Sequence, residues 1–348
     1  MSKKSQSGAV TLATTLLMLL LGSLAVMSAS KLVLFGQKTA TNAYHYGQSF
    51  QAAQAGVTRA ISYLSARPGV ASKRDVFFDT KTRRIKPDDL PFTEQLTDSR
   101  SRYTVQLSQP DADNDPYLIE VVSTGCADST ATCPSGENPA ATVTQLIKLR
   151  QLLASTPRDA LLVRGNADLS GNASVTNGTG QGLAVQAGAT LSVKDNKPGN
   201  YVGGLQANNK ALADTGPDAL FHHYFGNNKA AMKATLPVLK GQVPSDAGAY
   251  WVDGDLDLHG GDIGSPDNPV ILIVDGDLTV NGNTTIHGMI YASRCSKLNG
   301  TSAIYGALVV EGDCTILGNF TLVKDLGVLS RLPLAANPGK VIGSWRDF

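Results

Sequence analysis

The stretch Ala9-Val-Thr-Leu-Ala-Thr-Thr-Leu-Leu-Met-Leu-Leu-Leu-Gly-Ser-Leu-Ala-Val-Met-Ser-Ala29 decides how the chain begins to fold. Of its 21 residues, 15 are Ala, Val, Leu or Met, and no charged side chain occurs between Ser5 and Ser30. As a helix rising about 1.5 Å per residue, this stretch is long enough to cross the hydrocarbon core of a bilayer. Lys3 and Lys4 precede it, so the positive-inside bias predicts a cytoplasmic N-terminus and an exported remainder.

The apolar stretch is expected to continue directly into an amphipathic helix. Residues 31–66 contain no proline, and apolar residues recur there mostly every three or four positions, namely at Phe50, Ala53, Val57, Ala60, Ile61 and Leu64. This spacing places them on one helix face, and Pro68-Gly69 is expected to stop the helix. We therefore predict one helix over residues 9–66. Cleavage near Ser28-Ala29-Ser30, as in an ordinary secretory signal, is the alternative.

Composition divides the chain into two regions. The 348 residues include 30 Lys and Arg against 29 Asp and Glu, a balance that argues against nucleic acid as a partner. Of the 35 glycines, eight lie in residues 1–155 and 27 in residues 156–348. The second region is therefore expected to have the turn-dense architecture of an all-β domain.

Residues 67–155 predict a small domain with an antiparallel sheet. Residues 103–107 and 117–122 have strand-like composition, and residues 141–153 offer a third, longer strand. Between the first two strands, Asp111, Asp113 and Asp115 have the spacing of calcium ligands. However, Pro116 and Val122 stand where an EF-hand loop has Gly and Glu. A solvated hairpin turn is the favoured interpretation, and a calcium site is the alternative.

Residues 156–336 contain a repeat. Four segments, beginning at Val163, Val252, Val274 and Val310, share the pattern Val-x-Gly-[Asp/Asn]-x-x-aliphatic-x-Gly. The step from Val252 to Val274 is about one coil of a parallel β-helix, so we predict a right-handed parallel β-helix-like domain. A helical insertion at residues 197–248 interrupts it as a cap or flap. Its residues 217–226 and 227–236 are expected to form two short helices.

Polar residues of this region have two interpretations, as metal ligands or as turn residues. Acidic side chains recur at two repeat positions, at Asp253, Asp275 and Glu311 and at Asp255, Asp277 and Asp313. Calcium could bridge them, but the first repeat has Arg164 and Asn166 there, which favours turn chemistry. The Asn-x-Ser/Thr triplets at Asn172, Asn177, Asn283, Asn299 and Asn319 are likewise interpreted as turns. Of the adjacent His222 and His223, one is expected to be partly buried and one exposed, rather than both binding a metal.

The four cysteines lie in two local pairs, and an exported domain is expected to form disulfides. Four cysteines allow three pairings, of which locality favours Cys126–Cys133 with Cys295–Cys314. A zinc site is not expected, because no Cys-x-x-Cys or nearby His completes one.

Two N-terminal segments carry a family resemblance. Lys3-Lys4-Ser5-Gln6-Ser7-Gly8, followed by Ala9, resembles the leader of type IV prepilins, and Gly47-Gln-Ser-Phe-Gln-Ala-Ala-Gln-Ala-Gly56 resembles a stretch of PilX-type minor pilins. With the Phe-x-x-Tyr-Phe-Gly motif at residues 221–226 and the C-terminal residues 343–348, the chain is similar to long PilX N-terminal domain-containing pilus assembly proteins.

This resemblance implies a domain order, partners and a location. Residues 1–8 would be a prepilin leader that the prepilin peptidase removes by cutting between Gly8 and Ala9, with methylation of the new N-terminus. Residues 9–66 would be the membrane and amphipathic helix, residues 67–155 a pilin-like β domain, and residues 337–348 a C-terminal tail. The partners would be other minor and major pilins and the inner-membrane pilus assembly machinery, with a large tip adhesin in addition. The chain would lie in the bacterial inner membrane and then in the extracellular pilus.

We therefore expect a structural and interaction protein, not an enzyme and without a cofactor, because common catalytic motifs are missing from the sequence. The alternative is a membrane-anchored or secreted β-helix protein that acts on or binds polysaccharide. The resemblance also indicates a tip position, because Ala13 stands where major pilins carry a Glu that pairs with a neighbouring N-terminus.

Overall fold

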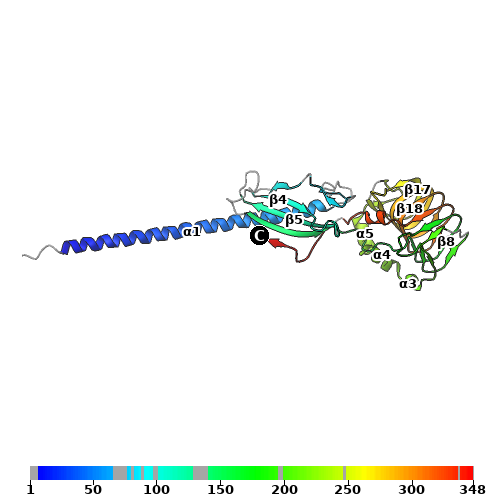
Figure 1. Ribbon diagram of the computed structural model, residues 1–348, viewed down its shortest axis with the longest axis horizontal. Helices are drawn as coiled ribbons and strands as arrows, with labels where there is room; N and C mark the ends of the chain where they lie inside the picture. The colour runs from blue at the N-terminus through cyan, green and yellow to red at the C-terminus, as the bar shows by residue number, and fades with distance from the viewer. Residues whose placement is uncertain are drawn as a thin grey trace, which may run out of the picture.

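The computed structural model describes residues 7–65, 77–79, 82–87, 90–96, 101–127, 140–194, 199–245, 248–335 and 338–347. Along the molecule lie a long helix, a six-stranded antiparallel sheet and a distal 14-stranded parallel sheet (Figure 1). A two-stranded hairpin, β1 (Phe78–Asp79) with β2 (Arg84–Ile85), accompanies the antiparallel sheet.

The N-terminal helix α1 runs unbroken from Ser7 to Leu64. This confirms the predicted continuity of the apolar stretch with an amphipathic helix, while Pro68 and Gly69 lie outside the described residues. Most of the predicted face is buried, since Ala53, Val57, Ala60 and Leu64 are at most 6% exposed. Phe50 and Ile61 are half-buried at its margins.

That face packs on the antiparallel sheet, whose strand order is β21-β6-β5-β4-β3. The three predicted strands are present as β4 (Arg102–Ser108), β5 (Leu118–Cys126) and β6 (Ala140–Lys148), and β3 (Phe92–Gln95) extends the sheet. Buried and less buried residues alternate along β4, β5 and β6, as expected when one sheet face meets a helix. The core between helix and sheet includes Val57, Val105, Ile119 and Val143.

The helix approaches the sheet closely at two glycines. A Cβ on Gly56 would collide with the Ser123 side chain, and a Cβ on Gly125 would collide with the backbone of Ser49 and Ala53. A buried hydrogen bond from the Ala127 amide to the Ser49 hydroxyl, 3.0 Å long, joins the same surfaces. The helix is thus seated on β5 by backbone-to-backbone contact that a side chain would prevent.

The C-terminal residues, predicted as a tail over residues 337–348, complete this sheet. β21 (Gly339–Lys340) and β22 (Arg346–Asp347) both pair antiparallel with β6. The Ser344 hydroxyl accepts a hydrogen bond from the Leu146 amide at 3.1 Å. Two-residue strands give too short an alternation to be recognised in a sequence.

The distal sheet curls so that its strands form three parallel ladders. The first ladder contains β14 (Val238–Leu239), β15 (Gly248–Val252), two stretches of β17 (Val270–Leu298), β18 (Ala303–Val310), β7 (Leu161–Val163), β10 (Val185–Ala187) and β13 (Leu205–Gln206). The second contains part of β16 (Leu256–Ile263), two stretches of β17, β19 (Cys314–Ile316), β8 (Ala167–Leu169) and β11 (Leu191–Val193). The third contains parts of β16, β17 and β18 with β20 (Thr321–Val323), β9 (Ser174–Thr176) and β12 (Tyr201–Val202).

We call a stretch of chain that passes once through the three ladders a coil. Successive coils enclose one apolar core. Val252 pairs with Val274, as the shared sequence pattern predicts, and Val163 pairs with Val310. Paired residues of coils that follow each other in the chain are 13 to 26 positions apart. The core contains the inward residues of all three ladders, among them Val163, Leu278 and Ile304. The curled parallel sheet is thus present, while the right-handed β-helix class stays a prediction.

The coils do not stack in chain order. β18, in the last coil, pairs with β7, in the first, and we call this junction the seam. The coils before and after it end at opposite faces of the stack, at β14 and at β13. Residues 207–237 connect these two ends and contain α3 (Lys210–Ala213), α4 (Pro217–Phe225) and α5 (Lys229–Thr235). We call this segment the helical crossover.

The helical crossover covers the outer face of the first ladder. Phe221 of α4 is fully buried and packs edge-on against Tyr291, with ring centroids 5.2 Å apart. The two predicted helices match α4 and α5, and Gly226 ends α4 in the left-handed conformation with φ 66°. The insertion therefore acts as a flap over a sheet face rather than as an end cap.

We predict that Gly125→Ala destabilises the protein by at least about 1–3 kcal/mol, because helix α1 must move off β5 to admit the methyl group. Thermal unfolding of the detergent-solubilised chain measures this loss. Gly47→Ala, whose Cβ meets nothing within 4 Å, is the matched control on α1 and should leave the melting temperature unchanged or slightly raised. Equal melting temperatures for both variants would contradict the close-approach argument.

Candidate functional site

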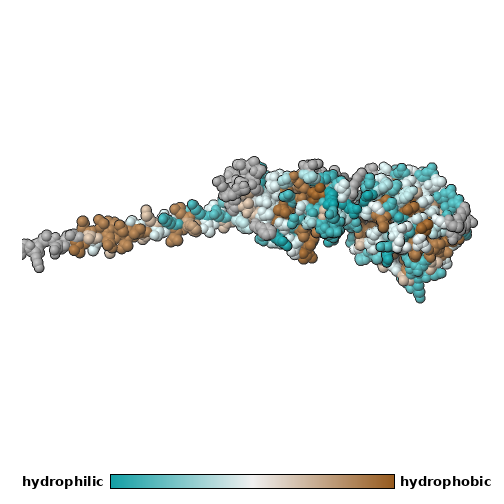
Figure 2. Space-filling view, viewed as in Figure 1, coloured by the Kyte–Doolittle hydropathy of each residue, from teal (hydrophilic) through white to brown (hydrophobic). Residues whose placement is uncertain are grey.

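The first candidate site is the apolar half of α1, residues 10–35, which no described part of the chain covers. Val10, Leu19 and Phe35 are 63%, 74% and 75% exposed. Figure 2 shows this band of hydrophobic residues on the helix, away from both folded domains. Residues 1–74 contain no Asp or Glu, so the charged side chains in and beside this band, Lys3, Lys4, Lys31 and Lys38, are all basic.

The polar groups within this band are satisfied locally. The Thr14 hydroxyl donates to the Val10 carbonyl at 3.0 Å, and the Thr15 hydroxyl donates to the Thr11 carbonyl at 3.0 Å. With every backbone group of a helix interior bonded inside the helix, such a segment can enter hydrocarbon without unpaired polar groups. At about 1.5 Å per residue, residues 10–35 span about 39 Å, more than the hydrocarbon thickness of about 30 Å.

The predicted peptidase site lies at the start of the same helix. Gly8 and Ala9 fall in the first turn of α1, and their side-chain surroundings lie outside the described residues. Ala13 is exposed one turn further on. Cleavage between Gly8 and Ala9 stays a prediction.

The Asp111, Asp113 and Asp115 carboxylates lie in the β4–β5 turn, and each has a different partner. Asp113 pairs with Arg84 at 2.6 Å, Asp115 pairs with Lys148 at 2.7 Å, and Asp111 accepts from the Asn114 side chain at 2.9 Å. Within the described ranges, no group of three or more His, Cys, Asp or Glu could hold a metal ion. The structure therefore does not gather these carboxylates into the calcium site considered above, because two of them already neutralise cations.

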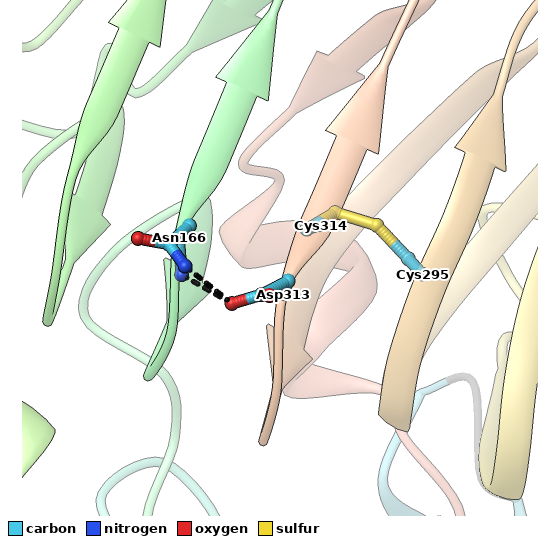
Figure 3. The surroundings of a disulfide bond; sticks show 4 residues. All are labelled: Asn166, Cys295, Asp313 and Cys314. Carbon is cyan, nitrogen blue, oxygen red and sulfur yellow. Dashed lines mark hydrogen bonds between the residues drawn. A yellow bond between two sulfur atoms is a disulfide. The ribbon is translucent and has the colours of Figure 1, made fainter.

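Two of the recurring acidic residues of the coils hydrogen-bond the backbone of the adjacent coil. Figure 3 shows Asp313, whose Oδ1 accepts from the Asn166 backbone amide at 2.6 Å and from its side chain at 3.0 Å. Asp255 Oδ1 likewise accepts from the Asp277 amide at 2.8 Å. Each carboxylate thus hydrogen-bonds the backbone of the next coil, which is the turn chemistry that the sequence favoured.

Glu311 departs from this pattern and has a structural role that sequence reasoning missed. Its side chain is buried, forms an ion pair with Lys229 of α5 at 2.7 Å and accepts from the Tyr291 hydroxyl at 2.8 Å. Burial, reinforced by the Glu311 charge, raises the pKa of Tyr291 well above its usual range. This cluster anchors the helical crossover to the first ladder.

The cysteine pairing is confirmed where it is described. Cys295 and Cys314 face each other in register across the second ladder and form a disulfide with Cα atoms 4.5 Å apart (Figure 3). Cys126 is also disulfide-bonded, whereas its predicted partner Cys133 lies outside the described residues. The described bridge joins two adjacent coils.

His222 and His223 correct one expectation, because both are exposed. They occupy the last turn of α4, where Phe221, Tyr224 and Phe225 take the buried face instead. A run of three aromatic rings in five residues leaves the intervening positions facing solvent.

A buried polar cluster that the sequence did not reveal lies at the seam. Asp159, Asn177 and Lys324 are 8%, 3% and 6% exposed. Asn177 stands in an Asn-x-Thr triplet interpreted above as a turn, and Lys324 stands outside the repeat pattern. Their only common signal is that each follows or precedes an apolar strand residue by one or two positions.

No known protein-family model matches the chain, and no curated protein does. Among solved structures, the crystal structure of the competence-associated pilin ComZ from Thermus thermophilus is similar over 87% of this chain and 97% of that chain. The sequence identity is 12% and the TM-score is 0.30. A function for this chain therefore has to come from its own residues.

We predict that Cys295 and Cys314 give no thiol signal when the unreduced protein is unfolded and labelled. The double variant Cys295→Ser with Cys314→Ser should lose about 2–4 kcal/mol of stability, because the bridge restricts the unfolded chain. Quantitative thiol labelling and denaturant unfolding measure the two effects. Full labelling of both cysteines before reduction would contradict the pairing.

Proposed function

We propose that this chain is a type IV pilus minor pilin of the PilX type, a structural subunit that presents its distal domain outside the cell. The observation that carries the proposal is the unbroken helix α1, which is apolar and exposed over residues 10–35 and docked on a sheet over residues 49–64. An exposed apolar helix needs a lipid or protein cover. A subunit that begins in a membrane and ends in a filament of packed helices would supply both in turn.

The sequence features support the same assignment. Lys3 and Lys4 before the helix orient it with the distal domain outside. The segment Gly47–Gly56 that resembles PilX-type pilins lies in α1 where the helix reaches the sheet, and Ala52, Ala53 and Gly56 are buried there. The resemblance thus falls on residues that pack α1 against the antiparallel sheet. We call this sheet, with the part of α1 docked on it, the head domain.

The distal domain gives this subunit its external surface. We interpret its three ladders as a β-helix whose outer faces are available to other pilins or to an adhesin. We further interpret this domain as non-enzymatic. The polysaccharide-binding alternative stays a prediction.

We predict that the mature protein begins at Ala9 with a methylated amino group, and that Gly8→Val blocks cleavage and keeps the protein in the membrane. The expected reason is that the peptidase of type IV prepilins needs a small residue before the cut. Mass spectrometry of the purified protein and recovery from sheared pili measure both effects. Gly36→Val is the matched control in α1, since its Cβ would meet nothing within 4 Å and cleavage should proceed.

A mature chain beginning near Ser30 would contradict the pilin proposal and favour a cleaved secretory signal. Equal recovery of Gly8→Val and of the unaltered protein in sheared pili would contradict it as well.

We further predict a position at or near the pilus tip. Ala13 cannot neutralise the N-terminal ammonium of a neighbouring subunit, and an unpaired charge in an apolar helix bundle is costly. The distal domain would also crowd a filament shaft. Immunogold labelling with antibody against residues 156–336 should mark filament ends in low copy number. Regular label along the shaft, with Ala13→Glu leaving assembly unchanged, would count against the tip.

A further inference from the structure

The cluster of Asp159, Asn177 and Lys324 lies where the first and last coils meet in the third ladder. Val323 pairs with Thr176, and the Lys324 amide donates to the Thr176 carbonyl at 2.8 Å. Lys324 and Asn177 are therefore the next residues on adjacent parallel strands. Both side chains are buried, so the amine and the carboxamide are both shielded from water.

The Asn177 carboxamide and the Lys324 amine share hydrogen-bond acceptors. Asn177 Nδ2 donates to the Arg158 carbonyl at 3.1 Å and to the Gln181 carbonyl at 3.0 Å. Lys324 Nζ donates to the same two carbonyl oxygens, closely to Arg158 and at 3.5 Å to Gln181. Because Nζ and Nδ2 share these two acceptors, the Lys324 amine lies near the Asn177 carboxamide, and such proximity favours attack of an amine on an amide.

The carboxamide of Asn177 is polarised in the direction that favours attack. Its Oδ1 accepts from the Thr179 hydroxyl at 2.7 Å and from the Thr179 amide at 3.3 Å. The orientation of the side chain is fixed, because Nδ2 faces carbonyl oxygens and Oδ1 faces an N–H. Two donors on Oδ1 withdraw electrons from Cγ and stabilise the oxyanion that forms when Cγ is attacked.

The neighbouring ionisable groups match the roles that such an attack requires. Burial lowers the pKa of Lys324, which favours the neutral, nucleophilic amine. A neutral amine has two N–H bonds for its two carbonyl acceptors and keeps its lone pair. Burial raises the pKa of Asp159, whose charge also interacts with Lys324.

We propose that Lys324 and Asn177 form an intramolecular amide bond across the seam. Lys324 Nζ bonds to Asn177 Cγ, and the Cγ–Nδ2 bond breaks. One proton passes from Nζ to the departing Nδ2, and one molecule of ammonia leaves. The reaction is an amide exchange, so it needs no oxidant, metal or cofactor.

This bond would fix the junction that chain connectivity leaves open. The disulfide Cys295–Cys314 already ties the last two coils before the seam. The amide would tie the last coil to the first, whose strands follow each other in space but not in sequence. The proposal concerns the distal domain alone and does not depend on the pilus assignment.

The mass of the intact, full-length protein tests the proposal. After reduction of the disulfides, the measured mass of the unaltered protein should be lower than the mass calculated from its sequence by the mass of one ammonia. Trypsin digestion should yield a branched peptide that joins the segment of Asn177 to the segment of Lys324, with no cleavage after Lys324. Lys324→Arg should show no loss of ammonia and give no branched peptide.

Lys194→Arg is the matched control, because Lys194 is an exposed lysine on a neighbouring coil and the ammonia loss should persist. A full sequence mass for the unaltered protein would overturn the proposal without any variant. So would a loss of ammonia with normal cleavage after Lys324, since that result identifies a succinimide at Asn177-Gly178 instead.

Discussion

The parallel pairing across the seam is the interaction on which the distal domain depends. All three ladders cross it, through β18 with β7, β19 with β8 and β20 with β9. The apolar core runs through it without interruption, since Val163, Leu169 and Val175 pack with Val310, Ile316 and Leu322. Neither group of coils can bury its end face without the other, so the domain folds as one unit.

The seam also explains how the distal domain is attached. The first coil begins and the last coil ends in the middle of the stack, so both connections leave from the same place. They stay together, because Gln151 and Leu334 form a bridge and the Ala335 amide donates to the Arg150 carbonyl at 2.7 Å. The first connection comes from β6, and the second ends in the strands that pair with β6. Strand β6 is therefore joined to the distal domain in two ways: the chain continues from it into the first coil, and it pairs with the strands that follow the last coil.

Sequence patterns predicted which residues form a helix face or a strand better than they predicted which strands lie side by side. The spacing of Ala53, Val57 and Ala60 identified the docked face of α1, and the shared pattern placed Val252 opposite Val274. The pattern could not predict that Val310 meets Val163, because equivalent coils offer equivalent edges to one another. The buried cluster at the seam was missed for the same reason, since Lys324 and Asn177 become neighbours only through that pairing.

Equivalent repeat positions also acquire different roles from what covers them. Asp253 is exposed and pairs with Lys233 of α5, whereas Glu311 at the same repeat position is buried and pairs with Lys229 of the same helix. Asp255, at the second repeat position, instead accepts a hydrogen bond from the Asp277 amide. The acidic residues of the repeat therefore include both anchors for the helical crossover and turn residues.

The order of the chain imposes a last constraint on the head. β21 and β22 complete the edge of β6, but they follow the whole distal domain in sequence. Their pairing closes a long loop whose entropy cost is offset only once residues 161–323 are compact and bring the two connections together. The pairing of β21 and β22 with β6 therefore costs least entropy in molecules whose distal domain is already compact.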